Sequence, residues 1–130
     1  MSEKKKSNEV KKMVLVVEDD PDSRAALCTM LEALGYRHMS FASAKEALNG
    51  IKGQHVDVAL LDIMMPEING YELIKLIRAL PEFKSLPIIM VTAKEAESEI
   101  IEGYQYGADY YITKPYTSAQ LEYGIKIFLP

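Results

Sequence analysis

The 130-residue chain has one cysteine, two histidines and no long apolar run. Because a single cysteine cannot form an internal disulfide, Cys28 indicates a reducing compartment, and we expect a cytoplasmic protein. No apolar stretch approaches the roughly 18 residues that a membrane-spanning helix needs. The first residues also lack the pattern of a signal peptide. His38 and His55 stand in no metal-ligand spacing, so we expect both to be solvent-exposed or loop residues and not metal ligands.

Charge is unevenly distributed along the sequence. Residues 1–12 contain five lysines and two glutamates, a net charge of +3, which leaves −7 for residues 13–130 of a chain whose total charge is −4. An acidic body argues against direct binding of nucleic acid. Residues 1–12 have almost nothing apolar to bury, so we expect a disordered basic tail followed by a single domain over residues 13–130.

Short apolar runs alternate with amphipathic stretches, which is the pattern of strand and helix units around a parallel sheet. The expected strands are residues 13–17, 37–42, 56–61, 87–91 and 110–113. The expected helices are residues 21–34, 44–50, 71–80, 97–106 and 118–128, each with ends approximate to a few residues. The sequence therefore predicts an α/β fold with five strands and five helices.

Local signals support these helices. Asp20 is a suitable N-cap for a helix with Pro21 at its first position, and Gly35 is suited to end that helix. Ser43 and Glu46 form a capping-box pattern for the second helix. Apolar residues at helical spacing predict one buried face for the third helix: Leu73, Leu76, Ile77 and Leu80.

Polar groups follow four of the predicted strands. The first apolar run ends at Glu18 and Asp19, the third ends at Asp62, and the last two end at Thr92 and Lys114. Because ligands of open parallel sheets bind at the carboxyl ends of the strands, we expect these groups to meet there. Like charges about 4 Å apart repel by about 4 kcal/mol at an effective dielectric of about 20. Gathered carboxylates therefore predict a divalent cation, and a hydroxyl and a lysine beside them suit a phosphoryl group.

In these features the sequence resembles the receiver domain of two-component response regulators, in particular the single-domain, chemotaxis-regulator type. The resemblance covers about residues 13–128 and implies a doubly wound, flavodoxin-like sheet with strand order 2-1-3-4-5. It rests on four segments in order: Val-Val-Glu-Asp-Asp-Pro (16–21), Leu-Leu-Asp-Ile-Met-Met-Pro-Glu-Ile-Asn-Gly (60–70), Val-Thr-Ala (91–93) and Tyr-Tyr-Ile-Thr-Lys-Pro (110–115).

The resemblance implies a role for each acid. Asp62 would accept a phosphoryl group from the phosphohistidine of a sensor histidine kinase or a phosphotransfer protein. Glu18, Asp19, Asp62 and the backbone carbonyl of Met64 would hold Mg²⁺. Glu18 occupies a position where the family also uses aspartate. On this reading the protein catalyses only its own phosphorylation and dephosphorylation.

The resemblance also implies a switch. Thr92 and Lys114 would contact the phosphoryl group as catalytic residues together with Asp62, and Thr92 would move toward it while Tyr111 turns inward behind it. The face made by the fourth helix, fifth strand and fifth helix would then bind a downstream partner or a second copy. The Lys114-Pro115 bond is expected to be cis by the same resemblance.

The later part of the chain is rich in tyrosine. Two interpretations stay open, an interface and half-buried packing of helices on the sheet. The tyrosines concerned are Tyr104, Tyr106, Tyr110, Tyr111, Tyr116 and Tyr123.

Four alternatives to an independent receiver can be weighed. The chain could be a module of a hybrid kinase or multidomain regulator. It could be a pseudo-receiver that binds partners without phosphorylation, although every expected site residue is present. An aspartyl-phosphate phosphatase would need a second acid at position 64, where the chain has Met64. A flavodoxin would need a phosphate loop after the first strand, where Glu18, Asp19 and Asp20 would repel the phosphate.

Overall fold

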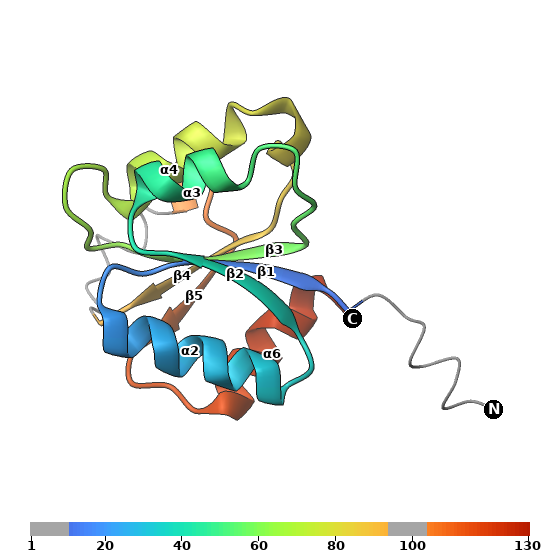
Figure 1. Ribbon diagram of the computed structural model, residues 1–130. Coiled ribbons are helices and arrows are strands. Elements are labelled where there is room, and N and C mark those ends of the chain that lie inside the picture. Colours follow the sequence, from blue (N-terminus) through green and yellow to red (C-terminus); the bar gives the residue numbers. More distant parts are fainter. Residues whose placement is uncertain (1–10, 94–103) are drawn as a thin grey trace.

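A computed structural model describes residues 11–93 and 104–130, which form a parallel sheet with helices on both faces (Figure 1). The strands are β1 (Met13–Val17), β2 (Arg37–Phe41), β3 (Val58–Asp62), β4 (Ile88–Thr92) and β5 (Tyr110–Thr113). The helices are α2 (Pro21–Ala33), α3 (Ala44–Gly50), α4 (Gly70–Arg78), the short 3-10 helix η1 (Pro81–Phe83) and α6 (Ser118–Phe128).

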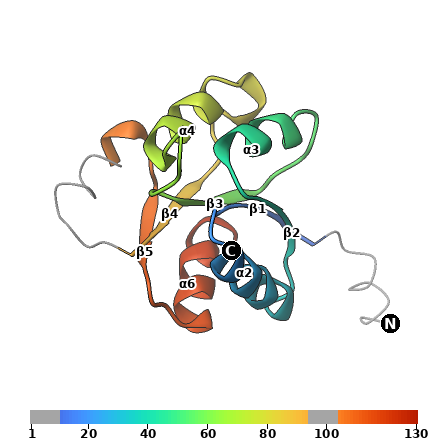
Figure 2. The same cartoon turned by 60° about the vertical axis from the view of Figure 1, so that its left-hand side comes forward.

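The order of the strands is β2-β1-β3-β4-β5, and all neighbours are parallel, which confirms the predicted doubly wound fold. Helices α2 and α6 cover one face of the sheet, and α3 and α4 cover the other (Figures 1 and 2). The helix predicted over residues 97–106 lies outside the described residues except for the helical Tyr104–Tyr106. The predicted tail, residues 1–12, lies outside them except for residues 11 and 12.

The sheet has an apolar core on each face. Successive residues of a strand point to opposite faces, so a strand covered on both sides must be apolar throughout. In β1, Val14 and Val16 belong to the core beneath α2 and α6. Leu15 and Val17 belong to the core beneath α3 and α4. The continuous apolar runs seen in the sequence follow from this two-sided burial.

Two strands reach further than their apolar runs. β3 includes Asp62, which pairs in register with Val91, and β4 includes Thr92, which pairs with Thr113. The sequence pattern placed both polar residues just after their strands, because it follows side-chain polarity. Ladder pairing depends on the backbone of the neighbouring strand instead, so Asp62 and Thr92 are held by the sheet itself.

The ends of α2 agree with the predicted caps. The Asp20 carboxylate accepts the Ser23 backbone N–H at 2.8 Å. At the other end Gly35 has a φ of +91°, and the Tyr36 N–H donates to Leu31 O at 2.9 Å. This is a Schellman motif, in which glycine adopts the left-handed conformation without a steric cost.

The predicted buried face of the third helix was wrong at one position. Leu76 is 41% exposed, whereas Leu73, Ile74 and Ile77 are fully buried. At 100° per residue, the buried stripe centres between residues 73 and 74 and continues at 77, which leaves position 76 on the flank. Leu80, beyond the end of α4, packs against the core only in part.

The two histidines differ from each other. His38 lies in β2 and its Nε2 contacts Glu32 Oε2 at 2.7 Å, with only 21% of the side chain exposed. The expectation of a solvent or loop residue was therefore wrong for His38, because the edge strand folds back beside α2. His55 is a loop residue with a 76% exposed side chain, as expected.

Candidate functional site

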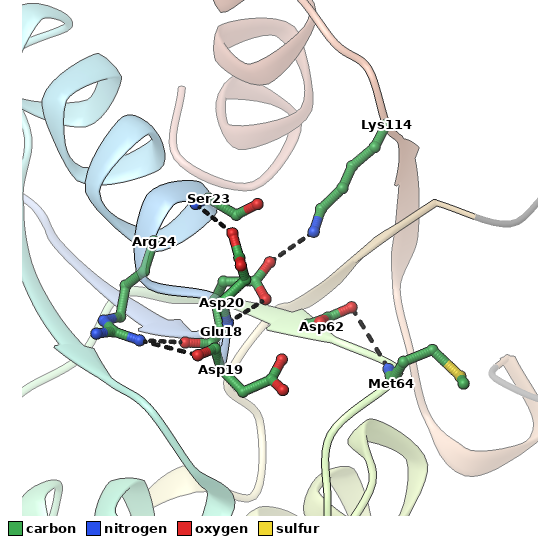
Figure 3. A network of polar contacts seen from close by, with 8 residues as sticks. All are labelled: Glu18, Asp19, Asp20, Ser23, Arg24, Asp62, Met64 and Lys114. Carbon is green, nitrogen blue, oxygen red and sulfur yellow. Dashed lines mark hydrogen bonds and ion pairs between the residues drawn. The ribbon is translucent and has the colours of Figure 1, made fainter.

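The carboxyl edge of the sheet brings together residues that are far apart in the sequence. Glu18 follows β1, Asp62 ends β3 and Lys114 follows β5, and their side chains converge in Figure 3. One carboxylate oxygen from each of Glu18, Asp19 and Asp62 lies within 4.8 Å of the other two. Oxygen donors in this number and spacing fit a hard divalent cation such as Mg²⁺.

Glu18 and Lys114 form a short ion pair inside this cluster. Lys114 Nζ donates to Glu18 Oε1 at 2.6 Å, and Glu18 is only 3% exposed. Burial would raise the pKa of Glu18, but the hydrogen bond from Lys114 and the bond shared with Asp62 hold it below the usual range. Burial would lower the pKa of Lys114, but the bond to Glu18 and the charge of Asp62 hold it above the usual range.

Asp62 is a buried carboxyl group with little compensation. It is 8% exposed, and its Oδ1 accepts the Met64 backbone N–H at a long 3.4 Å. Burial, together with the neighbouring Glu18, raises the pKa of Asp62 from 3.8 to about 7, and the charge of Lys114 offsets this only in part. Without a bound cation, the Asp62 carboxyl group is therefore near its titration midpoint at neutral pH.

Hydrogen bonds from Arg24 of α2 also fix the backbone of the acidic loop that follows β1. Arg24 Nη1 donates to Glu18 O at 2.8 Å and to Asp19 O at 3.4 Å (Figure 3). The Asp20 N–H donates to Glu18 Oε2 at 3.2 Å. Sequence reasoning missed Arg24. The signal that could have found it is a cation in the first turn of a helix, where the helix dipole disfavours positive charge.

The loop after Asp62 makes a tight return beneath that residue. Glu67 has a φ of +67°, and the Ile68 N–H donates to Pro66 O at 2.8 Å. At Gly70 an added Cβ would lie 2.4 Å from Asp62 O and 2.9 Å from Ile63 Cα, both backbone atoms. A side chain at position 70 would therefore push the backbone of Asp62. The sequence indicated Gly70 only as the end of the loop.

The two residues predicted to form the switch lie on β4 and β5, the strands that follow β3 in the order of the sheet. Thr92 is 1% exposed at the end of β4. Tyr111 lies on β5 opposite Met90, and its ring meets the Tyr104 ring edge-on at 5.1 Å between centroids. The Lys114-Pro115 bond after β5 is cis, as expected.

The tyrosines divide between the two interpretations left open by the sequence. Tyr104 and Tyr123 are 47% and 66% exposed, whereas Tyr110 and Tyr116 pack against the core. A groove of about 540 Å³ runs along β5 and the start of α6. Its lining includes Tyr110, Tyr111, Lys114, Pro115, Gln120 and Tyr123.

The sequence model of the response regulator receiver domain matches residues 14–126, and the chain belongs to this family of two-component signalling domains. The match covers the sheet from Val14 onward, the helices up to Lys126 in α6, and every residue of the cluster described above. Family membership and fold therefore agree.

Curated relatives include transcriptional regulators. The chain is 38% identical over 119 residues to the probable transcriptional regulator ycf27 of Porphyridium aerugineum, covering 92% of this chain and 48% of that protein. It is 34% identical over 113 residues to the phosphate regulon transcriptional regulatory protein PhoB of Klebsiella pneumoniae, covering 87% of this chain and 49% of that protein. The chain thus spans about half the length of the curated relatives it matches.

Solved structures give the same picture. The chemotaxis protein CheY4 of Vibrio cholerae superposes with a TM-score of 0.88 at 28% identity, over 92% of this chain and 99% of that one. The receiver domain of a sensor histidine kinase from Pseudomonas aeruginosa superposes with a TM-score of 0.85 at 29% identity, over 92% of this chain and 98% of that one. That second structure has a magnesium ion coordinated in its active site cleft.

Proposed function

We propose that the chain is a Mg²⁺-dependent, phosphorylatable switch in which Asp62 accepts the phosphoryl group. One observation carries this proposal: one carboxylate oxygen from each of Glu18, Asp19 and Asp62 lies within 4.8 Å of the other two, with Lys114 bonded to the same cluster. Glu18, Asp19, Asp62 and the Met64 carbonyl would hold the cation. Mg²⁺, when bound, would supply positive charge to these carboxylates and to the transferring phosphoryl group.

In the proposed reaction a carboxylate oxygen of Asp62 attacks the phosphorus of the donor. The bond between phosphorus and the donor's histidine nitrogen breaks, and its electron pair stays on that nitrogen. Lys114 would stabilise the negative charge on the transferring group as a point charge. The reaction modifies the chain itself, so the protein acts as a switch and turns over no free metabolite.

The same proposal assigns the response to Thr92 and Tyr111. The Thr92 hydroxyl would bind a phosphoryl oxygen, and Tyr111 would turn inward behind it. Such a movement would change the surface around β5 and α6, where Tyr123 is exposed and the groove lies. A two-state element of this kind converts a local change of charge into a structural change at a distant surface.

The proposed partners follow from this role. A sensor histidine kinase or a phosphotransfer protein would donate the phosphoryl group, and a protein partner or a second copy would bind the face that includes β5 and α6. Residues 13–130 would act as one receiver domain without direct contact to nucleic acid, and the cytoplasm is its proposed compartment. Within residues 11–93 and 104–130, no helix has the length and apolar character of a membrane span.

A second candidate keeps the same chemistry in a larger protein. The curated relatives are about twice as long as this chain, which favours a receiver that serves as one module of a multidomain regulator or hybrid kinase. A pseudo-receiver that binds partners unmodified has less support, because a buried, poorly compensated Asp62 is costly and would have no use there.

The test is the intact mass of the protein after incubation with acetyl phosphate, with Mg²⁺ or with EDTA. We expect wild type to gain about 80 Da, one phosphoryl group, only with Mg²⁺. Asp62→Ala should gain nothing under the same conditions. Asp57→Asn is the matched control, because Asp57 is a part-buried aspartate at the opposite edge of the sheet, and it should be labelled like wild type.

Absence of labelling in folded wild type would favour the pseudo-receiver. Equal labelling of wild type and Asp62→Ala would place the acceptor elsewhere and contradict the proposal directly.

A further inference from the structure

A positively charged side chain, that of Arg24, lies in the first turn of α2, where local electrostatics disfavour positive charge. Arg24 is the fourth residue of the helix that begins at Pro21, and its backbone N–H donates to Asp20 O at 2.9 Å. The partial positive charge of a helix N-terminus favours acids, and Asp22 supplies one in the same turn. Other contacts must therefore hold the Arg24 side chain in this position.

Those contacts are made with the backbone of the acidic loop. One guanidinium nitrogen, Nη1, donates to Glu18 O at 2.8 Å and to Asp19 O at 3.4 Å. In Figure 3 the guanidinium lies on one side of this loop, and the carboxylates of Glu18 and Asp19 lie on the other side, with that of Glu18 directed to Lys114. Arg24 thus contacts the backbone of two proposed metal ligands and not their carboxylates, which would bind the cation.

We propose that Arg24 is a positioning residue that sets the affinity of the site for Mg²⁺. The two carbonyls that it binds belong to the peptide groups before and after Cα of Asp19. Fixing both peptide planes fixes the direction in which the Asp19 side chain leaves the backbone, and it fixes the start of the loop at Glu18 as well. The inference rests on the proposed function, since it concerns the same cation.

Two effects of Arg24 on Mg²⁺ binding oppose each other. Its positive charge repels a divalent cation, whereas its hydrogen bonds keep two ligands in place. The charge is only half-buried and faces away from the carboxylates, so solvent and salt screen the repulsion. The hydrogen bonds act directly on the ligand backbone, and such outer-shell partners commonly change metal affinity more than tenfold. The positioning effect therefore dominates.

The experiment is calorimetric titration of the full chain with Mg²⁺, for wild type, Arg24→Gln and Arg24→Lys. We expect Arg24→Gln to bind Mg²⁺ about tenfold more weakly than wild type, at the low end of the range for outer-shell partners. Arg24→Lys should be intermediate, because one lysine nitrogen can also donate to both carbonyls but sits on a flexible stem without the rigid guanidinium geometry. Arg37→Gln is the matched control, since Arg37 also bonds a backbone carbonyl, Lys11 O at 3.0 Å, away from the acidic cluster, and it should bind like wild type.

A second readout separates positioning from a general loss of stability. Thermal unfolding is measured in EDTA and again with Mg²⁺, and labelling by acetyl phosphate is followed as a function of Mg²⁺ concentration. We expect Arg24→Gln to require more Mg²⁺ for half-maximal labelling and to reach the wild-type rate once Mg²⁺ saturates. A purely structural role would lower the melting temperature in EDTA and leave the Mg²⁺ requirement unchanged.

The outcomes are distinct. Weaker Mg²⁺ binding by Arg24→Gln, with Arg37→Gln unchanged, supports the inference. Unchanged or tighter binding by both Arg24 variants overturns it while the proposed function stands. If Arg24→Gln does not fold, Arg24→Lys decides the same question. Wild type that binds no Mg²⁺ and takes up no phosphoryl group overturns the proposed function, and the inference with it.

Discussion

The two edges of the sheet use aspartate in opposite ways. At the amino edge, Asp57 and Asp109 precede β3 and β5 and are tied to backbone donors of the neighbouring strands. At the carboxyl edge, Asp62 ends β3 and accepts one long backbone bond from Met64. All three aspartates adjoin strands of the sheet, but only those at the amino edge accept short hydrogen bonds from backbone donors.

At the amino edge the carboxylates lock the sheet. Asp57 Oδ2 accepts the Met13 N–H at 2.7 Å and so links the starts of β1 and β3. Asp109 Oδ2 accepts the Ile88 N–H at 2.8 Å and Arg78 Nη2 at 3.0 Å, which links the starts of β4 and β5. Burial would raise the pKa of Asp57, but the bonds from Met13 and His55 outweigh it and hold this pKa below the usual range.

At the carboxyl edge the opposite arrangement suits the proposed role of Asp62 as phospho-acceptor. Burial and the nearby Glu18 raise the pKa of Asp62 to about 7, because Lys114 bonds Glu18 instead. A carboxylate that is not neutralised by the protein can bind a cation or take up a phosphoryl group. The acids at the amino edge are thus satisfied by donors within the fold, whereas the proposed phospho-acceptor Asp62 is left with few donors at a cost in stability.

The largest expected effect is a gain of stability from Asp62→Asn. The folded wild type keeps on Asp62 a proton that the unfolded chain releases near its ordinary pKa of 3.8, so wild type loses stability as pH rises from about 4 to about 7. The full shift would correspond to about 4 kcal/mol, and solvent near the site reduces it to about 2–3 kcal/mol at pH 8. Urea unfolding in EDTA at pH 5 and pH 8 measures the difference. Equal stability of the two proteins at both pH values would contradict the proposed difference between the acids of the two sheet edges.

The next effect is a loss of about 2 kcal/mol from Arg78→Met at the amino edge. Arg78 donates to Leu86 O, to Gly107 O at 2.8 Å and to Asp109, so the change removes a donor from two backbone carbonyls and one of the donors to Asp109. Urea unfolding measures the loss, and Arg37→Met, which removes one exposed bond, should lose far less. Labelling by acetyl phosphate should keep the wild-type Mg²⁺ dependence. A changed Mg²⁺ requirement would show that the edges are not independent.

A smaller loss, about 1 kcal/mol at pH 7, is expected from Asp57→Asn, because a charged acceptor of the Met13 N–H is replaced by a neutral one. The pKa of Asp57 is lowered in the folded protein, so its stabilisation is present above an ordinary pKa of about 4 and is lost as pH falls through the folded pKa. The difference from wild type should therefore vanish in acid. A difference that persists unchanged at pH 2 would assign the loss to packing instead.

The smallest effect, below about 0.5 kcal/mol, is expected from His55→Gln. His55 Nε2 contacts Asp57 Oδ1 at 2.8 Å, but the His55 side chain is 76% exposed, so the ion pair is weak. Comparison with Asp57→Asn separates the backbone bond from the ion pair. A loss as large as that of Asp57→Asn would show that the histidine, not the Met13 N–H, stabilises Asp57.

Much of the fold was predictable because its causes are local or periodic. The two-sided burial of β1, β3 and β4 requires continuous apolar runs, and these are visible in the sequence. Asp20 and Gly35 mark the ends of α2 through their own side-chain and backbone preferences. Leu76 was misplaced because a helical repeat gives the width of a buried face only approximately.

The partners of the site residues were less predictable. Glu18 and Lys114 are 96 positions apart, and the sequence indicated that both lie at the same edge but not that they bond each other. The distance between an added Cβ at Gly70 and Asp62 O depends on how one loop folds beneath one strand. No pattern in the sequence predicts these distances, because each depends on how two separate segments pack together in the folded chain.

The sequence by itself determined the kind of fold and the edge at which the polar strand ends gather, since apolar periodicity and polar strand ends are properties of single segments. The tertiary structure alone decided how each charge is compensated. In the folded chain Lys114 pairs with Glu18, and Arg24 donates to the backbone of the acidic loop. The pKa of Asp62 is raised. The physical reason is that burial and charge pairing depend on neighbours contributed by distant strands and helices, which only the folded chain brings together.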